Sequence, residues 1–385
     1  SKSAEPEDSW KNKQLSRRYV LYGGLGLFAL ALILSILFQT ELKNVGIVRE
    51  DAGRADADFP SLDEIKNNWP GFRGPEGIGV AYHTDVPTEW DGPSGKNIIW
   101  KIPIPAVGFN SPIVWENRIF LSGADRNTQV VYCIDTESGE ILWLTELNDI
   151  LGSPDRRPQV TEDTGYAAPT MTTDGQRIFV LFATGDIACL DFEGKRIWAK
   201  NLGMPDNHYG HASSLITYRD LLLIPFDQNT GGRLLALRTR SGDLAYDQPR
   251  DVEISWASPI LVDTGSRTEL ILNSNPFVMS HDPQTGQELW RVRCMQGEIA
   301  PSPAYADGMV YAVNDYARLV GIQLGEIPEV VWEYIDDLSE VSSPLATKDF
   351  VIMAASYGTV TCFDSKTGER LWIQEFDDGF YSSPI

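Results

Sequence analysis

Two patterns of apolar residues divide the chain. Residues 19–38 are twenty consecutive residues without a charged side chain, which as a helix are long enough to cross the hydrocarbon core of a bilayer. After residue 69, short apolar stretches alternate with turns rich in Gly, Pro, Asp and Asn, as expected for many short β-strands. The sequence therefore predicts a membrane-spanning helix followed by an all-β domain.

The apolar stretches belong to a repeat in which a turn leads to a tryptophan. This element reads DTESGEILW at 135–143, DFEGKRIW at 191–198, DPQTGQELW at 282–290 and DSKTGERLW at 364–372. A weaker copy at 239–246 has Tyr246 in place of the tryptophan, and the VVW that ends at Trp332 keeps the tryptophan after a degenerate turn. A second element, usually Ser-Pro followed by two apolar strands, begins at Ser111, Ala168, Ser213, Ser258, Ser302 and Ser343, with a last copy at Ser383. Each unit then holds four short antiparallel strands, which is the content of a propeller blade.

The repeated turn residues have structural roles in this interpretation. The turn glycines supply the positive φ of a tight turn, and the tryptophans are expected to seal the gap between neighbouring blades. The predicted structural anchors are Trp100, Trp143, Trp198, Trp290, Trp332, Trp372, Gly139, Gly286 and Gly368. We expect an all-β fold, a β-propeller with six complete four-stranded units, with residues 98–105 as the closing strand of the last blade. The pattern also predicts a C-terminal portion beyond Ile385 and seven or eight blades in the parent protein.

The basic residues place the N-terminus. Lys and Arg are frequent before the apolar run and are matched by acids after it, so the positive-inside rule predicts a cytoplasmic tail at 1–18 and export of the remainder. We expect a transmembrane helix at 19–38, an acidic linker at 39–68 and a propeller at 69–385, on the periplasmic side of a bacterial inner membrane. A cleaved signal peptide is disfavoured because the apolar run is long and no A-x-A site follows closely. SRRYVL at 16–21 leaves open a twin-arginine export signal.

Charge and cysteine content restrict the partners. The chain has 54 acidic and 32 basic residues and a net charge of −22, a field that repels nucleic acid. The four cysteines are Cys133, Cys189, Cys294 and Cys362, without a CxxC pair, so they are interpreted as small buried apolar side chains.

Loops that precede the Ser-Pro elements should converge at the mouth of the propeller channel. The candidate interaction residues in these loops are Asp163, Tyr166, His208, His211, Glu253, Trp256, Glu298, Glu340 and Tyr381. An acid recurs at a similar position in most units, so these residues form either a carboxylate ring for a cation or basic peptide, or solvated loops whose acids cap turns. His208 and His211 are three residues apart but have no third ligand at a suitable spacing. We therefore assign no metal site, no catalytic residue and no cofactor-binding residue.

The D-x-x-T-G-x-x-x-W units resemble those of the PQQ-binding-like β-propellers, a family that includes quinoprotein dehydrogenases and the outer-membrane assembly factor BamB. WPGFRGPEGIGV at 69–80 and PTEW at 87–90 resemble the start of many bacterial PQQ-like repeat proteins. The resemblance covers residues 69–385 and is specific for fold more than for function. If the chain resembled the dehydrogenases of this family at their site, the resemblance would imply a vicinal Cys-Cys disulfide and a set of Glu, Asn and Asp that holds calcium. This sequence has no adjacent cysteine pair.

From these features we expect a protein-interaction scaffold or assembly subunit of a membrane complex, not an enzyme, with no cofactor. Its expected partners are other membrane or periplasmic proteins, with the membrane itself contacted through the N-terminal helix. BamB-like binding would add an extended strand at a blade edge or loop. The alternatives are a PQQ-dependent quinoprotein oxidoreductase and a ligand-binding sensor module.

Overall fold

The computed structural model describes residues 59–155 and 157–385, and residues 59–385 form one compact unit. The predicted cytoplasmic tail, the transmembrane helix at 19–38 and most of the acidic linker lie outside the described residues. No helix in the described part of the chain is both long and apolar enough to cross a membrane.

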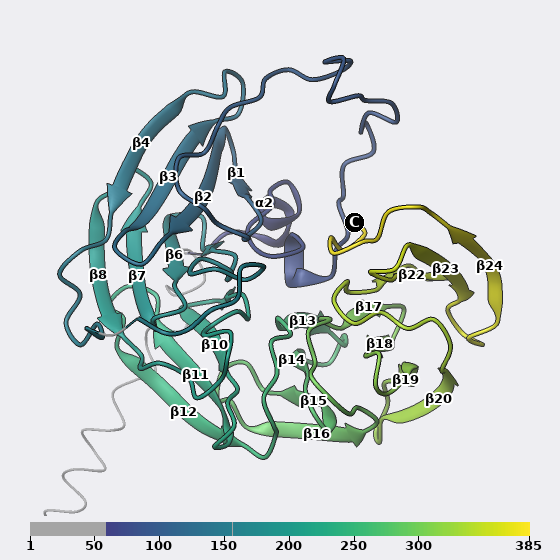
Figure 1. Ribbon diagram of the computed structural model, residues 1–385. Coiled ribbons are helices and arrows are strands. Elements are labelled where there is room, and N and C mark those ends of the chain that lie inside the picture. The colour runs from purple at the N-terminus through teal and green to yellow at the C-terminus, as the bar shows by residue number, and fades with distance from the viewer. Residues whose placement is uncertain (1–58, 156) are drawn as a thin grey trace, which may run out of the picture. The chain divides into compact units, whose positions relative to one another are not determined.

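The described residues form six four-stranded antiparallel sheets, and each sheet is made of four strands that follow one another in sequence. Blade 1 contains β1 (Ile113–Trp115), β2 (Arg118–Ala124), β3 (Gln129–Asp135) and β4 (Ile141–Glu146); blade 2 contains β5 (Thr172–Thr173), β6 (Arg177–Leu181), β7 (Asp186–Asp191) and β8 (Arg196–Asn201); blade 3 contains β9 (Ile216–Tyr218), β10 (Leu221–Phe226), β11 (Gly232–Arg238) and β12 (Leu244–Arg250). Blade 4 contains β13 (Ile260–Asp263), β14 (Thr268–Asn273), β15 (Phe277–His281) and β16 (Glu288–Arg293); blade 5 contains β17 (Ala304–Ala306), β18 (Met309–Val313), β19 (Leu319–Gln323) and β20 (Glu329–Tyr334); blade 6 contains β21 (Leu345–Ala346), β22 (Phe350–Ala354), β23 (Thr359–Asp364) and β24 (Arg370–Glu375). Figure 1 shows the blades following one another around a central axis, with β4, β8, β12, β16, β20 and β24 on the outside. The predicted all-β propeller with six complete units is confirmed.

The hydrophobic core lies between consecutive blades. Alternate residues of β6 illustrate this, because Ile178 and Val180 pack toward blade 1 whereas Phe179 and Leu181 pack toward blade 3. The same arrangement joins blades 3 and 4, 4 and 5, and 5 and 6. Since side chains of a strand alternate between its two faces, middle strands with a blade on each side have both faces buried. These strands are therefore apolar almost throughout.

A tryptophan or tyrosine of one blade covers the turn glycine of the next. The indole N–H of the covering residue also donates to a backbone carbonyl of that turn, at 2.9 Å for Trp100 to Thr136, Trp143 to Phe192, Trp198 to Thr239 and Trp332 to Ser365. Tyr246 does the same through its hydroxyl, which donates to the carbonyl of Pro283 at 3.0 Å. A Cβ at Gly139, Gly194, Gly242, Gly286 or Gly368 would lie 2.5 to 2.7 Å from a ring atom. The glycines are thus required both by a positive φ and by the ring above them.

Two predicted anchors do not follow this pattern. The indole of Trp290 donates to the carboxylate of Glu269 in its own blade, at 2.7 Å. The turn that Trp290 would cover, in blade 5, is the degenerate one around Gly325. A Cβ on Gly325 would meet nothing within 4 Å, so no ring of a described residue covers this turn. Trp372 on β24 is 47% exposed. Residues 98–105, expected as a closing strand, form no β-ladder in the structure, although Trp100 within them covers Gly139.

The Ser-Pro elements form a chain of hydrogen bonds from blade to blade. A backbone N–H of each blade donates to the hydroxyl at the same position of the next: Ser111 to Thr170 at 2.9 Å, Thr170 to Ser214 at 3.1 Å, Ser214 to Ser258 at 2.9 Å, Ser258 to Ser302 at 2.8 Å, Ser302 to Ser343 at 3.0 Å and Ser343 to Ser383 at 2.9 Å. In blade 2 the hydroxyl comes from Thr170, two residues after the expected start at Ala168. In blade 3 it comes from Ser214, one residue after the expected start at Ser213. The recurrent serine thus satisfies a backbone donor at the channel wall.

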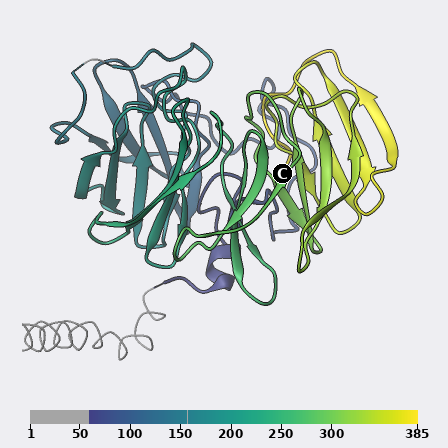
Figure 2. The same ribbon diagram turned by 90° about the horizontal axis from the view of Figure 1, so that it is seen from below.

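Residues 59–80, which we call the plug, cross one end of the channel. Within the plug, α2 (Leu62–Lys66) is capped by Ser61 and Glu64, and η2 (Pro75–Gly77) follows. Trp69 pairs with Val114 of β1, while the buried guanidinium of Arg73 donates to the carbonyl of Pro344 at 2.6 Å. Figure 2 shows α2 at one end of the unit. The plug thus contacts blades on both sides of the channel and covers this end.

Candidate interaction site at the open end of the channel

The loops that precede the innermost strands lie at the end opposite the plug. Each innermost strand starts after such a loop and ends in a turn on the plug side. In blade 2, for example, the turn after β5 contains Asp174, which lines a cavity together with residues of the plug. We call the loops 158–167, 203–211, 253–257 and 295–300 the channel mouth. They connect the outer strand of one blade to the inner strand of the next in blades 1 to 5.

Three aromatic rings from two of these loops meet at the channel mouth. The ring centroids of Tyr209 and Trp256 are 4.6 Å apart with their planes at 74°. His208 lies 4.6 Å from Tyr209 and 5.5 Å from Trp256. Trp256 is largely buried and its indole nitrogen has no hydrogen-bond partner among the described residues. This packing gives the mouth a rigid aromatic wall, since edge-to-face ring pairs hold a preferred geometry.

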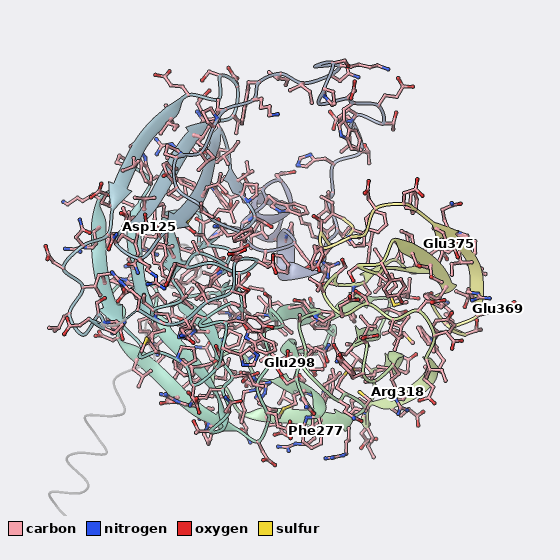
Figure 3. The ribbon with its side chains drawn as sticks, in the orientation of Figure 1. Asp125, Phe277, Glu298, Arg318, Glu369 and Glu375 are labelled. Atoms are coloured by element: carbon pink, nitrogen blue, oxygen red, sulfur yellow. The ribbon has the colours of Figure 1, made fainter. Side chains whose placement is uncertain are left out.

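Carboxylates from two further loops act on the aromatic wall. Glu298 Oε1 lies 3.4 Å from His208 Nε2, and both side chains are about half exposed. The pKa of the Tyr209 hydroxyl is raised by burial, and then by the negative charges of Glu298 and Asp163. In Figure 3, Glu298 lies closer to the central axis than Phe277, Arg318 and Glu369, which are at the periphery. The sequence-predicted residues His208, Trp256 and Glu298 are therefore neighbours in space, and the charge of Asp163 reaches the same cluster.

A groove continues from His208 across the loops of blades 1 and 2. It has a volume of about 750 Å³ and contains Tyr166, whose hydroxyl donates to the carbonyl of Pro158 at 3.2 Å. Arg126 and Arg157 line the same groove. Arg126 lies in the turn between β2 and β3, and Arg157 lies in the connection from β4 to β5 just before residue 158; the repeat gave no signal for either.

Arg157 is held by a buried carboxylate that the sequence analysis also missed. Its guanidinium lies 3.4 Å from Asp186, which is buried at the start of β7. Burial by itself raises the pKa of Asp186, but hydrogen bonds from Asn201, Thr184, Ser153 and Gln129 outweigh this effect and lower it. Asp186 therefore stays ionised and orders the wall of the groove.

The remaining candidate residues lie apart from the aromatic cluster. His211 is buried against Phe226, with ring centroids 4.7 Å apart, and does not converge with the exposed His208. Glu253 accepts a hydrogen bond from the Asn275 side chain at 2.9 Å. Glu340 accepts from the Ser356 hydroxyl, and Tyr381 is exposed on blade 6.

The residues present do not fit a quinone site of the kind that the resemblance implies. The four cysteines are free, and three of them lie on separate blades opposite the repeat tryptophan, as the pairs Cys133 and Trp143, Cys189 and Trp198, and Cys362 and Trp372. Among residues 59–155 and 157–385, His, Cys, Asp and Glu form no group of three that could hold a metal ion.

Solved structures with a similar fold include dehydrogenases. A europium-containing methanol dehydrogenase is 13% identical, with 84% of this chain and 88% of that chain covered and a TM-score of 0.51. BamB from Moraxella catarrhalis is 17% identical, covering 68% of this chain and 76% of that chain with a TM-score of 0.48. A quinohemoprotein alcohol dehydrogenase from Comamonas testosteroni is 12% identical, covering 87% and 76% with a TM-score of 0.47. The comparison with curated proteins gave no match.

These comparisons correct one expectation and establish the family. The expectation that the chain is not an enzyme is contradicted, because a methanol dehydrogenase is among the proteins that share its propeller fold. The family model described as outer membrane protein assembly factor BamB matches residues 98–255 and 262–385. The chain therefore belongs to this family of PQQ-like β-propeller repeat proteins.

Proposed function

We propose that this protein is a membrane-anchored propeller whose channel mouth binds a basic, extended segment of another membrane or periplasmic protein. The observation that carries the proposal is the contact of Tyr209 and Trp256 with His208, which lies 3.4 Å from Glu298, at the end that the plug leaves open; the charge of Asp163 also acts on Tyr209. Rigid aromatic rings beside carboxylates suit Lys and Arg side chains, which combine an apolar stem with a charged head. The net charge of −22 also favours encounter with a basic partner.

The anchor and the location are part of the same proposal. They are supported by the twenty uncharged residues at 19–38 and by the basic residues before them. The variants Ser3→Cys and Ser266→Cys place one thiol on each side of the predicted membrane segment. In cells with a permeabilised outer membrane, an impermeant maleimide should label only the Ser266→Cys protein; labelling of the Ser3→Cys variant alone would reverse the topology.

The binding proposal is tested with the full-length protein and two labelled peptides that alternate Val with either Lys or Glu. Fluorescence anisotropy should show that the Lys peptide binds and that the Glu peptide does not. The double variant Asp163→Asn, Glu298→Gln should bind the Lys peptide about tenfold more weakly, since each charge at a partly exposed site contributes about 1 kcal/mol or less. Glu369→Gln removes a similar exposed charge at the periphery of blade 6 and is the matched control (Figure 3).

Two results would contradict the proposal. One is equal binding of the Lys and Glu peptides by the wild-type protein. The other is loss of affinity in Glu369→Gln as large as in the double variant, which would mean that overall charge, and not the channel mouth, attracts the peptide.

A further inference from the structure

The end of the channel that carries the plug contains a separate cavity. It has a volume of about 340 Å³ and lies between the plug and the inner strands of blades 2 to 4. This volume is within the range of small-molecule sites, which are concave, mostly apolar and provided with a few polar groups. The channel mouth is at the other end of the propeller, so the two sites are distinct.

The wall of this cavity is mainly apolar and comes from two parts of the chain. The plug contributes Leu62 of α2 and Phe72, and the blades contribute Ile216 and Leu261. Leu62 is 59% exposed although it faces the cavity. An apolar ligand placed here would remove this surface from water, which is favourable in proportion to the area covered.

One carboxylate at the cavity has no partner. Glu76, in η2, lines the cavity and makes no hydrogen bond and no ion pair with another described residue. Its pKa is raised mainly by burial; the positive charge of Lys66 lowers it, and the weaker effect of Asp263 raises it again. Asp263 lines the same cavity. A partly buried carboxylate with no cation in direct contact gains from a ligand that brings a positive charge next to it.

The other charged groups of the wall are already engaged. Asp174 is paired with Arg177 at 2.6 Å. The guanidinium of Arg219 lies 5.4 Å from the ring centroid of Tyr218. Among the described residues, the wall therefore has two carboxylates without an ion pair, Glu76 and Asp263, against one such cation, Arg219, so its unpaired charge is negative on balance.

We propose that this cavity binds a small apolar amine. The apolar part of the ligand packs between Leu62 and Phe72 of the plug and Ile216 and Leu261 of the blades. Its ammonium group lies against Glu76, with Asp263 nearby. The site is independent of the peptide-binding mouth, and its chemistry differs in that it selects a small molecule with an enclosed apolar body.

The test uses three probes that differ only in the head group: 4-phenylbutylamine, 4-phenylbutan-1-ol and 4-phenylbutyrate. Calorimetric titration of the full-length protein near pH 7 should show the amine binding about tenfold more tightly than the alcohol, with the carboxylate weakest. Glu76→Gln keeps the side-chain shape and the backbone strain of a non-glycine residue at φ +59°. This variant should bind the amine and the alcohol equally, and its retained binding of the alcohol shows that the cavity is intact.

Two further variants separate the site from its surroundings. Leu62→Lys places a cation at the cavity and should abolish amine binding, and the exposed position on α2 tolerates the change. Glu298→Gln, at the channel mouth, should leave amine affinity unchanged. The proposal is overturned if no probe binds the wild-type protein saturably at millimolar concentration, or if Glu76→Gln binds the amine as tightly as wild type.

Discussion

Substitution of Gly242 by alanine tests the contact that joins the blades. Gly242 has φ +71°, and a Cβ on it would lie 2.7 Å from Cδ2 of Trp198, which covers it from the preceding blade. The left-handed conformation costs an alanine about 1 kcal/mol. The indole must also move away, which breaks its 2.9 Å hydrogen bond to the carbonyl of Thr239 and costs about 1 kcal/mol more. Loss of ring packing adds about 1 to 2 kcal/mol.

We therefore expect Gly242→Ala to lower the free energy of unfolding by about 3 to 4 kcal/mol. The matched control is Gly265→Ala, because Gly265 has φ +79° but a Cβ there would meet nothing within 4 Å. This control should lose only the conformational contribution of about 1 kcal/mol. Urea unfolding of the full-length protein, followed by far-ultraviolet circular dichroism, measures both variants without relying on the fluorescence of Trp198.

The same reasoning predicts a coupling between the two residues. In a Trp198→Leu background, the added cost of Gly242→Ala should fall toward that of Gly265→Ala, because the ring that the Cβ would meet is gone. Equal costs of Gly242→Ala and Gly265→Ala in the wild-type background would refute the argument, since turn conformation alone would then explain the conserved spacing of glycine and tryptophan in the repeat.

Two further predictions concern a buried histidine and the exposed tryptophan. Burial lowers the pKa of His211 from 6.5 to about 4. As the pH falls, this histidine is therefore protonated in the unfolded chain before it is protonated in the folded protein. The stability present above pH 6.5 is consequently lost between pH 6.5 and 4. His211→Gln should remove about 3 kcal/mol of this acid-side loss in urea unfolding at pH 7 and pH 4, and an unchanged difference between the two pH values would show that His211 does not contribute. Trp332 is 8% exposed and bonded to the Ser365 carbonyl, whereas Trp372 is 47% exposed, so Trp332→Leu should cost about 3 kcal/mol and Trp372→Leu less than about 1 kcal/mol. Thermal unfolding checks the pair, and a similar loss for both would mean that Trp372 is covered in solution.

Reasoning from sequence reached the blade but not the contacts between blades. The D-x-x-x-G-x-x-x-W spacing identified the turn and the tryptophan because each is local to one unit. It did not show that Trp198 covers Gly242, which is 44 residues later in the chain. That pairing depends on how neighbouring blades stack.

The candidate site shows the same division between local and distant information. The loops before the Ser-Pro elements were identified from the repeat, and His208, Trp256 and Glu298 do come together there, with the charge of Asp163 acting on the adjacent Tyr209. His211 was named with them but is buried instead, since alternate residues at the end of a loop can face either the channel or the core. The groove residues Arg126 and Arg157 were not identified, because neither occupies a position that recurs from unit to unit.

The sequence by itself determined the strand count, the four-stranded unit and the type of turn, because these follow from short-range alternation and from glycine at fixed positions. Only the tertiary structure decided which rings seal which glycines, which carboxylates meet at the channel mouth, and that the plug encloses a cavity beside Glu76. Those features join residues from different blades, and their energy comes from packing and from charge at short distances in space, which the order of residues along the chain does not specify.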